Sequence, residues 1–139
     1  MPVITMHASQ FTTPSDTNLL MSLLTKGQRP ALLVLCREGG LQAVVDSMMT
    51  WCAAPVHRCE LPGYLDLPLA RSGTLVLTNA AALSLEQQIE LYDWLDARRA
   101  VQVVSVTSKP IWPLVEQGRF LEGLFYRLNV VTLEASRTM

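Results

Sequence analysis

Polar residues that could do chemistry follow three short apolar runs of this sequence. They are the pairs Gly39 and Gly40, Thr78 and Asn79, and Thr107 and Ser108. Apolar runs of this kind, bounded by glycine or small polar residues, predict buried strands of a parallel sheet. Open α/β sheets usually bind ligands at the carboxyl ends of their strands, and a glycine loop between a strand and a helix suits a phosphate group. The sequence therefore indicates a candidate ligand site at the strand ends, with a glycine loop of the kind that can hold a phosphate group.

Cysteine and histidine form no recognisable metal or catalytic motif. His57 and Cys59 are two residues apart without a second such pair, and Cys36 and Cys52 add no CxxC spacing. An odd number of cysteines in this pattern predicts neither a zinc site nor a disulfide framework. The serines and the two histidines form no arrangement of nucleophile and base. We therefore expect no catalytic residue and no bound metal.

Length and composition indicate one globular domain covering residues 1–139. Half of the residues are apolar, which excludes a disordered chain, and the net charge of −1 gives no field to attract nucleic acid. No apolar run approaches the ~20 residues that a membrane span needs. Three cysteines without a signal sequence fit a reducing compartment. We expect a cytoplasmic protein without direct contact to nucleic acid or membrane.

Five strands are expected from apolar runs and their boundaries. They are Ala31–Leu35, Val56–Glu60, Thr74–Leu77, Val101–Val106 and Val130–Leu133. Residues 1–14 have mixed polarity without a clear period, and we expect them to form an extended or poorly ordered lead. Strands that alternate with helices predict a three-layer αβα sandwich with a five-stranded parallel sheet.

Helices are expected between these strands from apolar periodicity and capping residues. They are Thr17–Thr25, Leu41–Cys52, a helix from Ser84 to about Ala97, a short helix between Pro110 and Gly118, and Glu122–Leu128. The helix after Ser84 begins with a capping-box pattern that ends at Gln87. Its expected inner face consists of Leu85, Ile89, Tyr92 and Leu95.

Two segments resemble the ATPase domain of the sigma-54-dependent transcription activators, a branch of the AAA+ family. Gly73–Asn79 is similar to the family segment G-G-T-L-F-L-D-E, and Gly118–Val130 is similar to G-R-F-R-E-D-L-Y-Y-R-L-N-V. The resemblance implies an AAA+ nucleotide-binding subdomain with a P-loop-like fold. It places the Val101–Val106 strand between the Ala31–Leu35 and Thr74–Leu77 strands. The family continues into a helical lid and a helix-turn-helix, whereas this sequence ends at Met139, so we expect a truncated domain that lacks the lid.

The nucleotide-site positions of the family carry other residues in this chain. Alignment with the phosphate loop G-E-x-G-T-G-K-E puts Leu41 at the third glycine and Gln42 at the lysine. The Asp-Glu pair, which would organise magnesium and polarise water, is replaced by Thr78 and Asn79. The sensor asparagine is replaced by Ser108. The resemblance thus implies a non-enzyme without cofactor and a set of vestigial positions: Gly39, Gly40, Gln42, Thr78, Asn79, Thr107 and Ser108.

The resemblance also implies a face for protein partners. Two arginines of the family reach into the neighbouring subunit's nucleotide site; the first corresponds to Leu121 and the second to Arg127, so only the second remains. The GAFTGA loop that grips sigma-54 is absent from Leu61–Ser72. We expect a non-catalytic transcription regulator, of the kind found in two-component systems. Arg119 and Arg127 would face a protein partner, either a sigma-54 activator ring or a second copy.

Two alternatives remain open at this point. The chain could bind ATP or ADP with weak or no hydrolysis, because Gly39, Gly40 and the following helix could offer N–H groups to a phosphate. It could also be a response-regulator-like α/β binding domain, although no cluster of aspartates is present to build an acidic pocket. The order of strands in the sheet distinguishes the response-regulator-like fold from the AAA+ fold.

Overall fold

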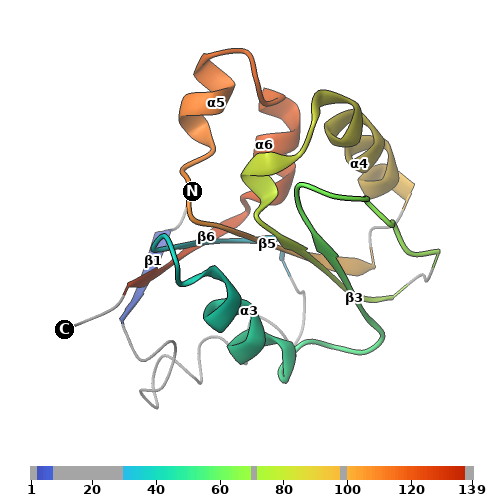
Figure 1. Cartoon of the computed structure of the whole chain (residues 1–139). Coiled ribbons are helices and arrows are strands. Elements are labelled where there is room, and N and C mark those ends of the chain that lie inside the picture. The colour runs from blue at the N-terminus through green and yellow to red at the C-terminus, as the bar shows by residue number, and fades with distance from the viewer. Residues whose placement is uncertain (1–2, 8–29, 70–71, 98–99, 137–139) are drawn as a thin grey trace.

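The computed structural model describes residues 3–7, 30–69, 72–97 and 100–136, which form an α/β domain (Figure 1). The helix expected at Thr17–Thr25 lies outside these residues. No helix in the described ranges is both long enough and apolar enough to cross a bilayer.

One parallel sheet of six strands forms the centre of the domain, in the order β1-β6-β2-β5-β4-β3. The strands are β1 (Val3–His7), β2 (Leu32–Cys36), β3 (Val56–Glu60), β4 (Gly73–Thr78), β5 (Val101–Thr107) and β6 (Val131–Ser136). All five expected strands are present. The sixth, β1, lies in the expected lead and pairs in parallel with β6 at the edge of the sheet.

The strand order is that of the AAA+ class, because β5 lies between β2 and β4. Val34 of β2 pairs with Val106 of β5, and Leu77 of β4 pairs with Ser105 of the same strand. The prediction of this order from the family resemblance is therefore confirmed, and it separates the fold from the response-regulator-like alternative. Since all strands are parallel, the carboxyl ends of β2, β5 and β4 lie side by side.

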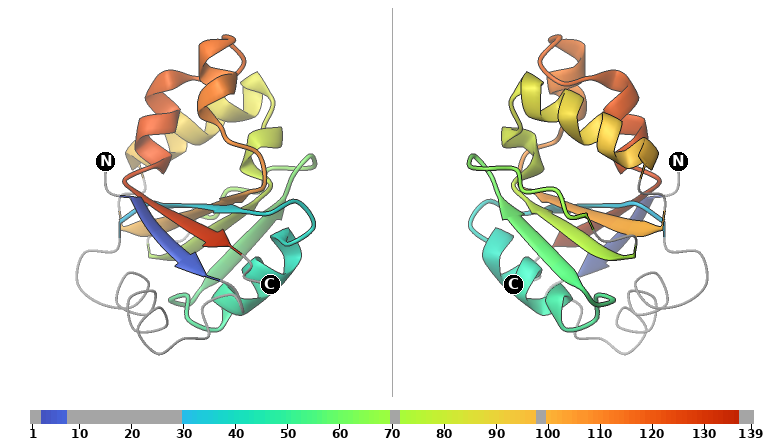
Figure 2. Two further views of the ribbon diagram at one scale, coloured as in Figure 1. Left: turned by 90° about the vertical axis from the view of Figure 1, so that its left-hand side faces the viewer. Right: turned by 90° about the vertical axis from the view of Figure 1, so that its right-hand side faces the viewer.

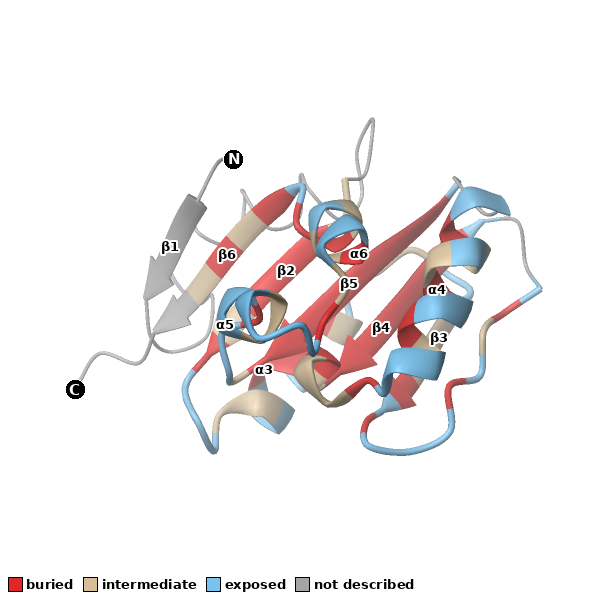
Figure 3. Cartoon of the chain, turned by 90° about the horizontal axis from the view of Figure 1, so that it is seen from above, coloured by how far each residue is buried: buried red, intermediate tan, exposed pale blue. Residues whose placement is uncertain are grey.

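Helices cover both faces of the sheet. The helix α3 (Leu41–Met49) lies under one face, while α4 (Leu85–Ala97), α5 (Trp112–Glu116) and α6 (Glu122–Leu128) lie over the other (Figures 1 and 3). A short 3-10 helix, η1 (Ala80–Ala82), joins β4 to α4. Side chains of successive strand residues alternate between the faces, so Val34 packs with the α3 cluster and Leu33 packs with the α4 and α6 cluster.

The helix α4 begins where the capping box predicts. The Ser84 N–H donates to Oε1 of Gln87 at 3.1 Å, and the Gln87 N–H donates to Oγ of Ser84 at the same distance. The expected inner face is partly wrong. Leu95 is buried, but Leu85 is 49 % exposed and Ile89 is 54 % exposed. The helix instead turns Gln88 and Leu91 inward, and hydrogen bonds described below explain why a glutamine can occupy the inner face.

The start of β4 depends on a glycine. Gly73 has φ +109°, and a Cβ placed on it would lie 2.3 Å from the carbonyl oxygen of Pro55. The same carbonyl accepts the Thr74 N–H at 3.0 Å, and the Thr74 hydroxyl donates to the Ala53 carbonyl at 2.9 Å. A side chain at Gly73 would therefore push apart the segment before β3 and the first residues of β4.

We expect Gly73→Ala to destabilise the domain more than Gly118→Ala. Both glycines have positive φ, which costs an L-residue about 1–2 kcal/mol, but no atom lies within 4 Å of a Cβ at Gly118. The clash at Gly73 adds about 1–3 kcal/mol. Urea unfolding of the two variants measures this difference. Equal losses of stability would contradict the close approach of Pro55 to Gly73.

Candidate functional site

A cavity of about 330 Å³ opens at the carboxyl ends of β2, β4 and β5. We call it the strand-end cavity. Its lining residues are Gly39, Leu41, Asn79, Ala81, Ala82, Ser108, Lys109, Leu114 and Arg119. Three of the seven vestigial positions, Gly39, Asn79 and Ser108, thus lie together in one cavity. Gly40, Gln42, Thr78 and Thr107 are not among its lining residues.

The loop between β2 and α3 is too short and too closed to be a phosphate loop. Only residues 37–40 separate strand from helix, and the Gly40 N–H donates to the Arg37 carbonyl at 2.9 Å. With Gly39 at φ +87°, these residues form a type II turn. The Gln42 side chain is exposed and donates to Asp46 at 2.9 Å. Neither Gly40 nor Gln42 therefore offers its donor to the cavity.

The end of β4 holds an amide and a hydroxyl where the family has two carboxylates. Thr78 is 5 % exposed, shares the α3 side of the sheet with Val76, and its Oγ1 has no hydrogen-bond partner in the described residues. Asn79 adopts a left-handed conformation (φ 67°, ψ 52°), and its side-chain N–H donates to the Leu61 carbonyl at 2.9 Å. Its backbone N–H donates to Val106 at 2.7 Å. The Asn79 side chain thus serves local structure, whereas the Thr78 hydroxyl is buried without a partner among the described residues.

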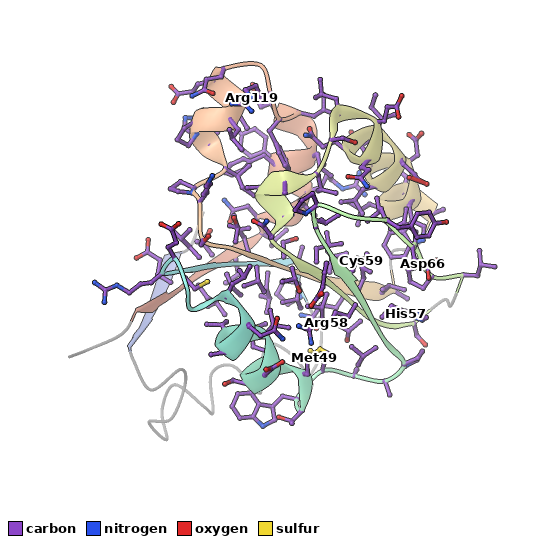
Figure 4. The ribbon with its side chains drawn as sticks, in the orientation of Figure 1. Met49, His57, Arg58, Cys59, Asp66 and Arg119 are labelled. Atoms are coloured by element: carbon purple, nitrogen blue, oxygen red, sulfur yellow. The ribbon has the colours of Figure 1, made fainter. Side chains whose placement is uncertain are left out.

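Metal binding has no support in the described ranges, where no group of three or more His, Cys, Asp or Glu side chains comes together. His57 and Cys59 lie on the edge strand β3, where Figure 4 labels them, and Cys59 packs in the buried cluster on the α4 and α6 side of the sheet. The Cys59 thiol donates to the Asp66 carbonyl at 3.3 Å. The spacing of His57 and Cys59 is therefore that of alternate residues in an edge strand.

The end of β5 brings a cation to the strand-end cavity. The Thr107 hydroxyl donates to the Lys109 carbonyl at 2.9 Å and accepts the Lys109 N–H at 3.2 Å, which closes a tight turn. This turn places Ser108 and Lys109 at the cavity wall. Lys109 was not among the expected site residues, although it follows the sensor position directly.

The two arginines expected to face a partner lie in different environments. Arg127 donates to Asp96 at 2.7 Å, and its guanidinium carbon lies 5.4 Å from the centroid of the Tyr92 ring. Arg119 is exposed, lines the strand-end cavity, and forms no hydrogen bond or ion pair through its guanidinium within the described residues. Figure 4 places it in the helical layer above the sheet. Arg119 is therefore the available cation, whereas Arg127 is already paired.

Gln88 fixes the loop that carries Arg119. This glutamine is completely buried, donates to the carbonyls of Leu83 and Arg119 at 3.1 Å each, and accepts the Leu121 N–H at 2.8 Å. Within the described residues, no other hydrogen bond is formed by the Leu83 carbonyl before α4, or by the Arg119 carbonyl and the Leu121 N–H on the loop. The sequence signal for this residue was a polar position in register with Leu91 and Leu95, which are three and seven residues further along α4.

A stripe of α4 continues this attachment. Tyr92 lies four residues after Gln88, and a Cβ at Gly123 would be 3.4 Å from its ring. Asp96, four residues further, forms the ion pair with Arg127. Residues spaced by four lie on one side of a helix, so Gln88, Tyr92 and Asp96 together hold α6 and the loop before it. We call these three residues the α4 clamp.

The Cys36 thiol is buried and unreactive. In the alignment with the family's phosphate loop, Cys36 takes the position of the first glycine. The thiol is 6 % exposed and donates to the Thr107 carbonyl at 3.7 Å. Burial raises the pKa of Cys36 to about 11, and burial also raises the pKa of Cys52 to about 11. Since the thiolate is the nucleophilic form, these cysteines are not nucleophiles at neutral pH.

The strand order, the layers and the cavity at the strand ends define an AAA+ P-loop-like α/β domain, in which the described residues include no helical lid. The family model of the sigma-54 interaction domain matches residues 44–136, which is more than half of the chain. The chain therefore belongs to the sigma-54 interaction domain family.

Curated relatives match about half of this chain. The DNA-binding transcriptional activator HyfR of Escherichia coli K12 is 36 % identical over 78 residues, which are 48 % of this chain and 12 % of HyfR. The probable regulatory protein HrpR of Pseudomonas syringae is 34 % identical over 84 residues, 52 % of this chain and 26 % of HrpR. A putative NtrX-like response regulator of Rickettsia bellii is 33 % identical over 79 residues, 49 % of this chain and 16 % of that protein. The chain thus spans at most about a quarter of these relatives.

Solved structures show the same fold. NtrX of Brucella abortus, determined in complex with ATP, superposes with a TM-score of 0.65 at 16 % identity and covers 88 % of this chain and 35 % of its own. The P-loop NTPase domain of a sigma-54 activator from E. coli has a TM-score of 0.53 at 16 % identity and covers 84 % of this chain and 98 % of its own.

We expect Gln88→Leu to lower the free energy of unfolding by about 3 kcal/mol or more. The apolar side chain would leave the Leu121 N–H and two carbonyls without partners, and each unsatisfied buried group costs about 1–3 kcal/mol. Amide hydrogen exchange at Leu121 should accelerate in parallel. The exposed Asp93→Asn on the same helix serves as control and should stay within about 0.5 kcal/mol of wild type. A Gln88→Leu variant as stable as this control would exclude the proposed attachment.

Proposed function

We propose that this protein is a non-catalytic transcription regulator that acts through protein contacts made by the strand-end cavity and the Arg119 loop. The observation that carries the proposal is the contrast between Arg119, whose guanidinium is exposed at the cavity and has no partner among the described residues, and Thr78 and Asn79, which carry no charge. The AAA+ frame is kept, and the groups that would organise an ATP-bound metal are replaced.

Hydrolysis lacks the groups that it needs at this site. A magnesium ion prefers carboxylate and phosphate oxygens, and the polar atom of Thr78 is buried on the α3 side of the sheet. The Asn79 amide is bonded to Leu61 and cannot polarise an attacking water as a carboxylate would. Phosphate-loop contacts are also reduced, because the turn at Gly40 uses the N–H of that residue. These features support a role without ATP turnover.

The protein-contact role is supported by the Arg119 loop and its surroundings. Gln88 holds the loop rigidly, so an exposed guanidinium at its surface needs little ordering when a partner binds. Arginine is enriched in interfaces because its planar group donates several hydrogen bonds to carboxylates. The relatives named above include transcription activators, so an activator of this family is the partner to test first.

We expect the purified chain to bind the ATPase domain of a sigma-54-dependent activator from the same organism, and Arg119→Glu to weaken binding about tenfold or more. Binding is measured by biolayer interferometry with the activator domain immobilised. Arg37→Glu is the matched control, because Arg37 is exposed close to the cavity in sequence but is not one of its lining residues. Arg127→Ala should have a smaller effect than Arg119→Glu, since Asp96 already holds Arg127. Absence of binding by the wild-type chain to any such activator, together with absence of self-association, would refute the proposal.

Nucleotide binding without hydrolysis is the second candidate function. The cavity of about 330 Å³, with Lys109 and Arg119 in its wall, is the observation that favours it. Lysine and arginine are the residues that usually hold phosphates, and Gly39 brings bare backbone to the same space. A ligand that binds only the folded state raises the melting temperature, and the rise increases with the logarithm of ligand concentration relative to its Kd.

Thermal denaturation with ATP and with ADP distinguishes the two functions. Nucleotide binding at the cavity predicts a rise in melting temperature that is lost in a Lys109→Ala/Arg119→Ala variant and kept in Arg37→Ala. The proposed protein-contact role predicts no rise at millimolar nucleotide and no phosphate release above the blank. Measurable phosphate release by the wild-type chain would contradict both.

A further inference from the structure

A second cavity, of about 140 Å³, lies between the sheet and the helices α5 and α6. We call it the aromatic pocket. The strand β2 contributes Leu33 and Leu35 to its lining, β6 contributes Thr132, and the helices contribute Trp112 and Phe125. In the left-hand view of Figure 2, β6 lies at the front of the sheet, with α5 and α6 above the sheet. The aromatic pocket shares no lining residue with the strand-end cavity and is therefore a separate candidate site.

Aromatic rings form the wall of the pocket on the helical side. The centroid of the Trp112 ring lies 5.3 Å from that of Phe125, with 54° between the ring planes. Tyr126 packs beside both rings, at 6.3 Å from Trp112 and 5.5 Å from Phe125, but it does not line the pocket. Trp112 is 39 % exposed, so this wall reaches the surface. Tilted and edge-to-face pairs of rings attract each other, and a ring that enters the pocket extends this cluster.

The polar side chains of the pocket are already hydrogen-bonded. The Thr107 hydroxyl donates to the Lys109 carbonyl and accepts the Lys109 N–H. The Thr132 hydroxyl donates to Oδ1 of Asn129. No charged residue of the described ranges lines the pocket. A charged ligand or a peptide backbone would therefore give up hydrogen bonds to water without replacement here, whereas an apolar ring has none to give up.

The size of the pocket limits its ligand to a small molecule. The volume of about 140 Å³ is close to that of an apolar cavity of about 150 Å³, lined by Leu, Ile and Phe, that binds benzene in another protein. A ligand of one or two rings fills such a space. A nucleotide is too large for it and carries charges that the lining cannot compensate.

We propose that the aromatic pocket binds a small neutral aromatic molecule of one or two rings. The ligand lies between Leu33 and Leu35 of β2 on one side and the rings of Trp112 and Phe125 on the other. This site goes beyond the proposed protein-contact function and does not depend on it. Trp112 is the first residue of α5, and Leu114 of the same helix lines the strand-end cavity, so a bound ring holds in place the helix that separates the two cavities.

Titration of the full chain into 5-fluoroindole tests the site. Binding is measured by fluorine NMR, because the signal of the probe shifts and broadens when the ring leaves water for the protein. We expect a saturable change with a Kd of about 1 mM or tighter, which is the affinity that burial of one aromatic ring supplies. Unlabelled indole should compete with the probe for the same site.

Two variants remove the site in different ways. Leu35→Trp fills the pocket with a larger side chain from a half-buried position of β2, and Trp112→Ala removes part of the aromatic wall. Each should weaken binding about tenfold or more. Tyr64→Ala is the matched control, because Tyr64 is an aromatic residue that is 84 % exposed and lies outside the pocket, and this variant should bind as wild type does. Circular dichroism verifies the fold of every variant.

Several results would overturn the inference. These are the absence of a saturable change at millimolar probe, or binding that both pocket variants retain. If benzoate binds as tightly as indole, the pocket does not select neutral rings and the assigned class of ligand is wrong. If a capped tryptophan peptide binds more than about tenfold tighter than indole, the pocket receives a side chain of a partner protein instead of a free small molecule.

Discussion

The central strands of this domain have to be covered on both faces, and this requirement determines where everything else lies. Every residue of β4 and β5 is buried. Strands of this kind persist only between two layers of helices, because each face would otherwise expose apolar side chains to water. All strands run parallel, and this brings the ends of β2, β5 and β4 to one edge. The strand-end cavity exists because three neighbouring strands stop together.

In this arrangement, the residues that stabilise the sheet are different from the residues that could do chemistry at the strand ends. Leu75, Val76 and Leu77 are buried within β4 and hold it in the sheet. Thr78 is the last residue of this strand, and Asn79 follows it. The Asn79 amide in fact stabilises the frame, since it links β4 to the residue after β3 through the Leu61 carbonyl. A domain of this family can therefore carry residues other than Asp and Glu at this point without losing its sheet. The folded sheet with its helices then remains available for contacts with other proteins.

The sequence predicted the sheet well because buried strands are continuous apolar runs. The strand β1 was not expected as part of the sheet, since Val3–His7 mixes apolar and polar residues as edge strands do. The rotation of α4 was predicted wrongly for a different reason. Periodicity favours Leu85 and Ile89 as inner residues, but the partners that make Gln88 a suitable core residue lie 31 and 33 positions away in the chain. Only the tertiary structure brings them together.

The candidate site was predictable in outline and less so in detail. Glycines and strand-end polar residues indicated this edge of the sheet, and Gly39, Asn79 and Ser108 line one cavity there. Which arginine is free could not be predicted, because the pairing of Arg127 depends on how α6 lies against α4. Lys109 enters the cavity through a turn closed by Thr107, a local geometry that residue types alone do not specify.

The α4 clamp has a consequence for how this domain opens. Gln88, Tyr92 and Asp96 attach α4 at three points to α6 and to the loop before it. Local opening in proteins occurs in contiguous cooperative units. We therefore expect α4, α6 and the loop before α6 to open as one such unit.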